Sequence, residues 1–392
     1  MASPQSSTPD IEIAITAVAH GGDGIGRYND IACFVSGTLP GDTVRARIYR
    51  RSKKALWARL LEMLTPSPFR IQQSACAERD CAPVCAWHDF SYPAQGQWKQ
   101  RIVAESLRRI GGISTEVAFV ENPALRTAYR TRAIFHGDAE NLGYYAPRTH
   151  DVVPLPPCPL NHKRLNEALE ALRPLGIRGN IHVTVNPEGD ETLVWLREPS
   201  EAVQARFPLT DFAASDGRAQ FIFDGVPIVN GAFSQASLLL NRMLRRETDQ
   251  RIGDASSLLD LYCGNGNLSL HYANHCRIIG VDHAHAAIAA ANKRAPDTYQ
   301  CGDEATMAAL IAQNTWDVIL LDPPRVGAKP IMKSLAEAKA RRIIYVSCNP
   351  ATFSRDAHEL VASGWALIST AALDMFPHTP HVETIGVFER SD

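Results

Sequence analysis

Two carboxylic acids and a thiol stand at the ends of apolar segments late in the chain. Asp322 follows the apolar segment 316–321 and Cys348 follows the segment 343–346, while Glu383 lies near the start of a third such segment. A thiol can add to an electrophilic carbon, and a carboxylate can accept a proton. Open α/β sheets gather such groups along one edge, where their strands end. The sequence therefore predicts a catalytic arrangement of one thiol and two acids.

The alternative for Cys348 is a buried and unreactive thiol. Free cysteines are among the most buried residue types, so an isolated cysteine favours that interpretation. Cys348 instead lies in the segment 345–350, which ends in a turn enforced by Pro350. The turn presents the thiol just beyond a strand, and the acids at the neighbouring strand ends favour a reactive group.

A glycine-rich turn upstream predicts a site for an adenosine-containing cofactor. The apolar strand 257–262 leads into Cys-Gly-Asn-Gly-Asn-Leu at 263–268, which is expected to open a helix, and the next strand, 277–282, ends in Asp282. Glycines let the backbone approach a ligand closely, and an acid one βαβ unit later can accept hydrogen bonds from ribose hydroxyls. The chain lacks a longer Gly-x-Gly-x-x-Gly run and a Walker lysine, which argues against dinucleotide redox chemistry and phosphoryl transfer. The pattern points to S-adenosylmethionine.

These motifs need a scaffold, and the chain divides into four segments by pattern. Residues 1–9 look like a disordered lead, and residues 10–66 carry short strands with a turn cluster at 20–26, as in a small β-barrel. Residues 67–222 are predicted to form a mainly β central domain after a helix over 97–110. Strands and helices alternate over 223–392, as in a nucleotide-type α/β domain with a helix beginning near Ala236.

The predicted barrel contains a basic stretch with no acid between Asp42 and Glu62. Its aromatic residues are Tyr49 and Trp57, and its cations are Arg45, Arg47, Arg50, Arg51, Lys53, Lys54 and Arg59. Cations can contact phosphates while aromatic rings stack on bases, so the stretch is typical of RNA binding. A solvated charged face is the alternative.

Three of the nine cysteines, Cys76, Cys81 and Cys85, fall within ten residues. In a chain without a secretory segment, such a cluster favours metal ligation over disulfides. Four thiolates satisfy Zn²⁺ or an iron–sulfur cluster, and Cys158, held between prolines, is the expected fourth ligand. The spacing does not choose between the two metals.

Length and composition fit a globular protein of two or three domains. The chain has 392 residues, 45% hydrophobic and 21% charged, with a net charge of −2. No apolar run is long enough to span a membrane, and the N-terminus lacks the pattern of a signal peptide, so we expect a cytoplasmic protein. A near-neutral chain must bind nucleic acid through a local patch.

The motifs together resemble the RNA (uracil-5-)-methyltransferase family. The resemblance rests on Asp-Pro-Pro-Arg-Val-Gly at 322–327, Ile-Tyr-Val-Ser-Cys-Asn-Pro-Ala-Thr at 344–352 and Pro-His-Val-Glu-Thr at 380–384. It extends to Phe-Ser-Gln at 233–235 and Leu-Tyr-Cys-Gly at 261–264. The barrel resembles a TRAM domain, and a TRAM domain with clustered cysteines is similar to the 23S ribosomal RNA branch. The resemblance implies a Rossmann-like class I methyltransferase domain, an OB-like barrel and a central RNA-binding domain.

In this family a thiolate adds to carbon 6 of uracil, which makes carbon 5 nucleophilic toward the methyl group of S-adenosylmethionine. By motif position, Cys348 would be the nucleophile and Glu383 the base that removes the proton from carbon 5. The resemblance also implies contacts with the methyl donor. The candidate residues are Gln235, Tyr262, Asn267, Asp282, Asp303 and Asp322.

The resemblance further implies a [4Fe–4S] cluster on Cys76, Cys81, Cys85 and Cys158 that organises the RNA-binding region, with zinc as the alternative. The target base must be single-stranded or flipped out. We expect a monomer that acts on ribosomal RNA. The alternatives are uridine 54 of transfer RNA, a class I methyltransferase with another substrate and a structural Cys348, and an RNA-binding module with an inactive methyltransferase domain.

Overall fold

The computed structural model describes residues 10–72, 85–146, 149–215 and 217–390. The described residues form two compact units. The first contains the segments before residue 103 together with 378–381, and the second contains 103–377 and 382–390. In these ranges, no helix is long and apolar enough to cross a membrane.

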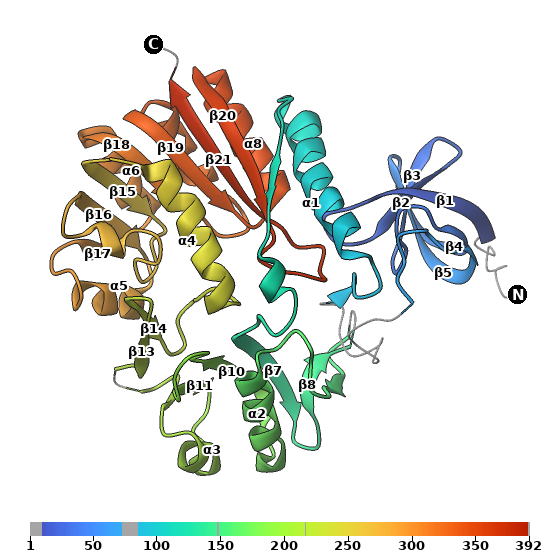
Figure 1. Cartoon of the computed structure of the whole chain (residues 1–392), viewed down its shortest axis with the longest axis horizontal. Coiled ribbons are helices and arrows are strands. Elements are labelled where there is room, and N and C mark those ends of the chain that lie inside the picture. The colour runs from blue at the N-terminus through green and yellow to red at the C-terminus, as the bar shows by residue number, and fades with distance from the viewer. Residues whose placement is uncertain (1–9, 73–84, 147–148, 216, 391–392) are drawn as a thin grey trace, which may run out of the picture. The chain divides into compact units, whose positions relative to one another are not determined.

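The first unit contains a closed five-stranded barrel with the order β1-β2-β3-β5-β4 (Figure 1). Its strands are β1 (Asp10–Val18), β2 (Gly24–Tyr28), β3 (Ile31–Val35), β4 (Thr43–Arg51) and β5 (Ala55–Thr65). The predicted barrel is therefore confirmed. Part of the predicted turn cluster is wrong, because Gly24 and Gly26 belong to β2. A Cβ on Gly26 would lie 2.4 Å from the carbonyl oxygen of Ala14, so glycine permits the close approach of β2 to β1.

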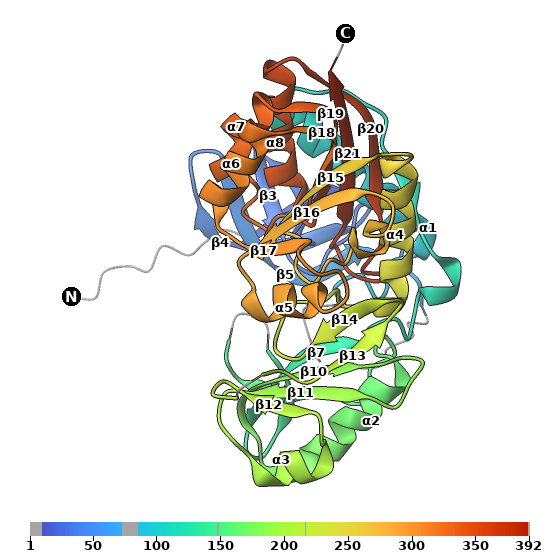
Figure 2. The ribbon, with the colours of Figure 1, turned by 90° about the vertical axis from the view of Figure 1, so that its left-hand side faces the viewer.

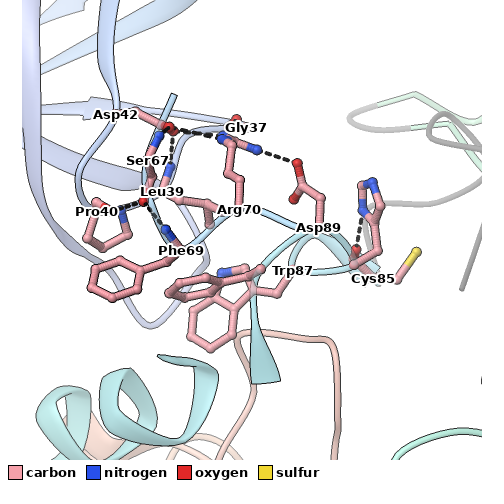
Figure 3. A network of polar contacts seen from close by, with 12 residues as sticks. Gly37, Leu39, Pro40, Asp42, Ser67, Phe69, Arg70, Cys85, Trp87 and Asp89 are labelled. Carbon is pink, nitrogen blue, oxygen red and sulfur yellow. Dashed lines mark hydrogen bonds and ion pairs between the residues drawn. The ribbon is translucent and has the colours of Figure 1, made fainter. Parts of the chain in front are cut away.

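A buried ion-pair network closes this unit (Figure 3). The Asp42 carboxylate is fully buried and accepts hydrogen bonds from the backbone N–H groups of Leu39 (2.6 Å) and Ser67 (2.7 Å). The Arg70 guanidinium lies 2.7 Å from Asp42 and also pairs with Asp89. Arg70 thereby ties the barrel to the segment that precedes helix α1.

The second unit contains a six-stranded sheet in its central region, with the order β12-β11-β10-β7-β8-β9 (Figure 1). Helix α2 packs against β10. The strands are β7 (Arg132–Asp138), β8 (Leu142–Tyr145), β9 (Val152–Pro154), β10 (Arg178–Val185), β11 (Thr192–Leu196) and β12 (Thr210–Phe212). The hairpin of β13 (Gln220–Phe223) and β14 (Val226–Val229) follows and spans the predicted domain boundary near residue 222. That boundary stays a prediction.

An eight-stranded sheet follows, with the order β17-β16-β15-β18-β19-β21-β20-β6. The strands are β6 (Ala118–Val120), β15 (Ser257–Leu261), β16 (Arg277–Asp282), β17 (Tyr299–Cys301), β18 (Thr315–Leu321), β19 (Lys339–Ser347), β20 (Trp365–Leu373) and β21 (Glu383–Arg390). Strands β15 to β19 are parallel, and β21 is antiparallel to both of its neighbours. The sheet is Rossmann-like, as predicted.

Helices cover both faces of this sheet, with α4 on one side and α6, α7 and α8 on the other (Figure 2). Burial on both faces explains why its central strands are continuously apolar. The helices are α1 (Tyr92–Ser106), α2 (Lys163–Leu172), α3 (Glu201–Arg206), α4 (Leu238–Ile252), α5 (His285–Asn292), α6 (Glu304–Gln313), α7 (Met332–Ala336) and α8 (Pro350–Ala362). Short 3-10 helices span Pro123–Leu125, Arg173–Leu175, Leu270–Tyr272 and Lys329–Ile331.

Two helix predictions need correction. The helix expected over 97–110 begins earlier, at Tyr92, and α1 is followed by a π-helical turn, Leu107–Gly111. The glycine-rich turn does not open an α-helix, and its first helical segment is the 3-10 helix Leu270–Tyr272. Gly264 and Gly266 have φ angles of +55° and +75°, which an α-helix cannot contain.

Candidate active site

The reactive groups predicted from the sequence meet where β18, β19 and β21 lie side by side. Ser347 at the end of β19 pairs with Thr384 near the start of β21 in antiparallel register. Cys348 directly follows Ser347, just beyond the end of β19, and Glu383 directly precedes Thr384, and the two groups interact electrostatically. The thiol and the carboxyl group are therefore neighbours because of strand register.

Cys348 is half-buried, and burial raises the pKa of its thiol to about 11, with further increases from the Glu383 and Asp322 carboxylates. The Arg325 guanidinium opposes this shift, because it donates a hydrogen bond to Cys348 and its positive charge stabilises the thiolate. At neutral pH the free site thus holds a protonated thiol beside a cation that can stabilise the thiolate.

Glu383 is only 3% exposed. Burial, together with the charge of Asp322, raises the pKa of its carboxyl group well above the usual range. Its Oε1 atom is buried and has no hydrogen-bond partner within the described part of the chain. An unpaired buried carboxyl oxygen is costly for folding, so its presence favours a role with a bound ligand.

Arg325 is a site residue that the sequence predictions omitted. Its carbonyl oxygen accepts hydrogen bonds from Nδ2 of Asn349 (3.0 Å) and Oγ1 of Thr352 (3.2 Å), which joins the turn after β18 to the turn that carries Cys348. The available signal was a cation three residues after Asp322, in a turn made rigid by two prolines.

The buried carboxylate of Asp356 connects the turn after β18 to strand β19, which leads into the second turn. Asp356 on α8 is fully buried, and its Oδ2 accepts hydrogen bonds from the Tyr345 hydroxyl (2.7 Å) and the Ala328 N–H (2.9 Å). Tyr345 belongs to β19, and Ala328 follows the Arg325 turn. The network therefore fixes the strand and the turn that position the thiol and the guanidinium.

Three of the predicted donor contacts gather at the ends of β15, β16 and β18. Asp282 accepts hydrogen bonds from the backbone N–H groups of Gly264 (2.9 Å) and Ala284 (2.8 Å). Burial and the charge of Asp282 raise the pKa of Asp322 to about 7. Tyr262 is half-buried and has a left-handed φ of +59°, and burial raises the pKa of its hydroxyl to about 12. The glycine-rich turn, Tyr262, Asp282 and Asp322 thus lie together at the ends of these strands, and we call this edge the rim.

The other predicted donor residues have different surroundings. The Asn267 amide exchanges two hydrogen bonds with Asn241 of α4, at 2.7 and 3.0 Å. Asp303 is exposed and caps α6 by accepting hydrogen bonds from the N–H and hydroxyl of Thr306. Gln235 is buried in the loop before α4. Asn267 and Asp303 therefore have local structural partners of their own.

Asp260, beneath the glycine turn, also went unnoticed in the sequence. It is 2% exposed and accepts a hydrogen bond of 2.6 Å from Ser269, which also contacts the Tyr299 hydroxyl at 2.9 Å. Burial raises the pKa of Asp260 to about 7, and Asp322 and Asp282 add to the shift. Three mutually repelling carboxyl groups favour a cationic ligand above them.

The predicted metal ligands are only partly described. Cys76 and Cys81 lie outside the described residues, Cys85 is buried, and Cys158 is half-buried. Asn166 of α2 holds the Cys158 peptide on both sides, accepting from its N–H and donating to its carbonyl, each at 3.0 Å. Among the residues with described positions, no group of three or more metal-binding side chains occurs.

The basic stretch of the barrel is partly neutralised. Arg47 pairs with Asp10 at 2.7 Å, and Arg45 lies 2.7 Å from Glu62. Beyond these pairs, the Arg50 guanidinium lies 4.4 Å from the ring centre of Trp57, which stacks on Phe34. Lys53 and Lys54 are exposed in the turn between β4 and β5.

Comparisons with known proteins agree with this architecture. Residues 308–391 match the family described as tRNA (Uracil-5-)-methyltransferase, and residues 10–61 match the TRAM domain. An RNA methyltransferase of Gloeobacter violaceus is 31% identical, covering 97% of this chain and 96% of the relative. A 23S rRNA (uracil(1939)-C(5))-methyltransferase of Alkalilimnicola ehrlichii is 30% identical, with 97% and 96% coverage.

A solved structure shares the fold. The Pyrococcus abyssi tRNA (uracil-54, C5)-methyltransferase, in complex with S-adenosyl-L-homocysteine, superposes with a TM-score of 0.74. The alignment has 23% sequence identity and covers 96% of this chain and all of that one. The predicted combination of barrel, central domain and Rossmann-like domain is therefore confirmed.

Proposed function

This chain belongs to the RNA (uracil-5-)-methyltransferase family, and we propose that it methylates carbon 5 of one uridine in 23S ribosomal RNA. Two relatives named for that activity are 29% and 30% identical and cover nearly all of this chain. Their names specify uracil 1939, and the corresponding uridine is the proposed target. Uridine 54 of transfer RNA is the alternative, which the Pyrococcus abyssi protein acts on by its name.

The observation that supports the proposed chemistry is the pairing of Ser347 with Thr384, which brings the adjacent Cys348 and Glu383 close enough to interact electrostatically. The Cys348 thiol first gives its proton to water, with the resulting thiolate stabilised by Arg325, and the sulfur then forms a bond to carbon 6 of the uracil while the ring electrons move toward oxygen 4. Carbon 5 then takes the methyl group supplied by S-adenosylmethionine, which leaves S-adenosylhomocysteine. Glu383 removes the proton from carbon 5, the carbon–sulfur bond breaks, and the thiolate is released.

Arg325 would act both in the addition of the thiolate to the uracil and in its later elimination. Its guanidinium stabilises the anionic form of Cys348 before the addition and after the elimination. The unpaired Oε1 of Glu383 supports a role as the proton acceptor, because it becomes satisfied only when a ligand occupies the site. In the proposed mechanism, the raised pKa of Glu383 makes its carboxylate a stronger base once it is ionised.

The methyl donor would lie over the rim formed by Tyr262, Asp282 and Asp322. Gln235 is assigned to the donor by its position in the family motif, and Asn267 and Asp303 would lie at the margins of the site. A sulfonium and an ammonium group carry positive charge, which suits a rim with several carboxyl groups. Asn267 would act by holding the glycine turn against α4, since its amide is already paired with Asn241.

We also propose that Cys76, Cys81, Cys85 and Cys158 hold a [4Fe–4S] cluster, with zinc as the alternative. The donor set of four thiolates fits either metal site. The fixed peptide of Cys158 supports a ligand role, and the Arg130 guanidinium interacts with Cys158 electrostatically. Iron and sulfide analysis of the purified protein would support the cluster, and stoichiometric zinc without iron would contradict it.

The test of the function uses methyl transfer and one substitution. We expect the purified chain to transfer labelled methyl groups to 23S ribosomal RNA lacking 5-methyluridine, at a single uridine. Cys348→Ala should abolish the transfer, whereas Cys276→Ala, directly before the start of β16 and at the opposite end of that strand from Asp282, should retain it. Transfer that survives in Cys348→Ala would refute the covalent mechanism, and RNA binding by the unchanged chain without any transfer would indicate an RNA-binding module.

A further inference from the structure

One face of the central sheet carries side chains that are unusual for a solvated surface. Along β7, Ala133 and Phe135 are buried, while Arg132, Ile134 and His136 occupy the alternate positions and so point to the opposite face. We call this second face, with its partners on the neighbouring strands, the open face. Its members are Ile134, His136, Tyr145, Asn180, His182 and Trp195.

Strand register assembles these side chains from four strands. His182 of β10 lies opposite both Ile134 of β7 and Trp195 of β11. Asn180 lies opposite His136, and its Oδ1 is 2.8 Å from the Nδ1 atom of His136. The open face is therefore a contiguous surface in which each side chain has a neighbour across the ladder.

The open face combines exposed apolar area with flat rings. Ile134 is 39% exposed at the centre of the face. The ring of His136 stacks on Tyr145 with centroids 3.7 Å apart and an interplanar angle of 10°. The rings of His182 and Trp195 lie 4.9 Å apart and are less accessible, because Nδ1 of His182 and Nε1 of Trp195 are buried and Gly231 lies against the indole. Unpaired nucleobases bind to such surfaces, because rings stack on bases and nearby polar groups pair with base edges.

The charges on and next to the open face are compatible with binding of an anionic RNA backbone. None of the six members is acidic, and Arg132 adds a cation in the next row of the sheet. The Arg132 guanidinium lies 5.5 Å from the ring centre of Phe233, a side chain that is 72% exposed. A phosphate backbone next to stacked bases would meet no repelling carboxylate along these rows, and burial lowers the pKa of Arg132, whose side chain is only partly exposed.

The open face continues into the loop that carries a predicted donor contact. Arg132 donates a hydrogen bond of 2.8 Å from Nη1 to the carbonyl oxygen of Ser234, directly before Gln235. The row of Arg132 is covered at its β11 end, because Leu193, which like Arg132 pairs with Thr184, packs with Phe221 and Val226 of the hairpin β13–β14. The more accessible part of the open face is therefore on β7 and β8, at Ile134, His136 and Tyr145.

We propose that the open face binds the unpaired nucleotides adjacent to the target uridine, with their bases against Ile134 and the His136–Tyr145 rings. The inference rests on the proposed function for the identity of the RNA. It assigns to the central domain the recognition of single-stranded sequence next to the target, separate from the barrel cations. An RNA with this stretch held in a duplex should bind less tightly, because its bases would not be free to stack.

The first test measures RNA affinity. The probe is an unstructured oligouridylate of about 12 nucleotides, bound to the intact protein. We expect Ile134→Asp to weaken binding about tenfold, since it removes apolar contact and adds charge repulsion. Ile368→Asp is the matched control, because Ile368 is a 50% exposed strand isoleucine on β20. Equal affinities of the two variants, with equal melting temperatures and methyl-donor binding, would overturn the proposal.

The second test needs no substitution in the protein. The same oligonucleotide is prepared with 4-thiouridine, crosslinked to the unchanged chain by light, and the modified peptides are identified by mass spectrometry. We expect crosslinks to peptides containing Ile134, His136 or Tyr145, and crosslinks confined to other regions would overturn the proposal. Crosslinks to the open face in a chain without methyl transfer would refute the proposed function alone, whereas normal transfer without them would refute this inference alone.

Discussion

Cys348 and Glu383 resist ionisation for a shared physical reason. Burial removes both side chains from water, and nearby carboxylates add to the effect: Asp322 acts on Glu383, and both Glu383 and Asp322 act on Cys348. The neutral pair is therefore the stable state of the free site. When the Cys348 sulfur is bonded to the substrate, no thiolate charge remains to oppose the ionisation of Glu383, so its carboxyl group can lose its proton more easily.

Substituting Glu383 by glutamine should separate the two halves of the proposed reaction. The amide cannot accept the proton from carbon 5, so methylation can proceed while elimination stalls. We expect turnover to fall at least about 100-fold and a covalent protein–RNA species to accumulate, seen as a slow band on a denaturing gel. Glu389→Gln, at the other end of β21, should show neither effect. A Glu383→Gln enzyme with normal turnover and no such band would exclude Glu383 as the base.

The interaction of Arg325 with Cys348 leads to a prediction about how alkylation of Cys348 depends on pH. With a pKa of about 11 for Cys348, its alkylation by iodoacetamide should rise continuously from about pH 7 to about pH 10, because the thiolate is the reactive form. Arg325→Ala removes a cation that lowers this pKa, so the pKa rises and alkylation slows by about three- to tenfold at each pH. Mass spectrometry of the Cys348 peptide gives the rates. Arg341→Ala, at the start of β19, is the control, and identical profiles for the two variants would contradict the role of Arg325.

At the scale of elements, strand ends were the most predictable feature. Apolar runs followed by Asp322, Cys348 and Asp282 were sufficient to place each residue at the end of a strand, because buried parallel strands have a continuous apolar pattern. The insertion of β21 between β19 and β20 was not predictable from such runs. It is a long-range pairing, and it brings the start of β21, with Glu383, to the end of β19, which Cys348 follows.

Hydrogen bonds between polar side chains were harder to predict than strands, because their partners are distant in the sequence. The pairing of Asn267 with Asn241 joins residues 26 positions apart, and nothing in either local sequence indicates it. The positive φ angles of Gly264 and Gly266 explain why the expected helix is replaced by turns. Glycine permits both conformations, so only the packing of the turn against its neighbours decides between them.

The Arg70 network predicts an asymmetry in stability between two ion pairs of the barrel. Arg70→Leu would leave the fully buried Asp42 carboxylate without its cation, and breaking a buried pair costs about 3–5 kcal/mol in the free energy of unfolding. Urea unfolding followed by tryptophan fluorescence should show the loss. Arg47→Leu breaks the exposed pair with Asp10 and should leave the midpoint unchanged. Equal midpoints for both variants would contradict the importance of the network.

At the scale of the whole molecule, a net charge of −2 means that RNA must be attracted by charges concentrated in one region. The barrel supplies such a region, but its cations are not equivalent. Arg45 and Arg47 face carboxylates on neighbouring strands, whereas Lys53 and Lys54 are exposed and form no ion pair with any residue whose position is described. Stacking on the open face is much less sensitive to salt than phosphate contacts, so the two surfaces can be distinguished by salt dependence.

The double substitution Lys53→Ala and Lys54→Ala should therefore change the salt dependence of RNA binding. For single strands, each lost phosphate contact lowers the slope of log K against log salt by about 0.7, so the slope should fall by about 1.4. Arg45→Ala should change it little, because Glu12 and Glu62 already neutralise that guanidinium. Titrations at several salt concentrations give the slopes. A double variant with the unchanged slope would show that the β4–β5 turn does not contact the RNA backbone, and the attraction would then have to arise from the cations along β4 itself.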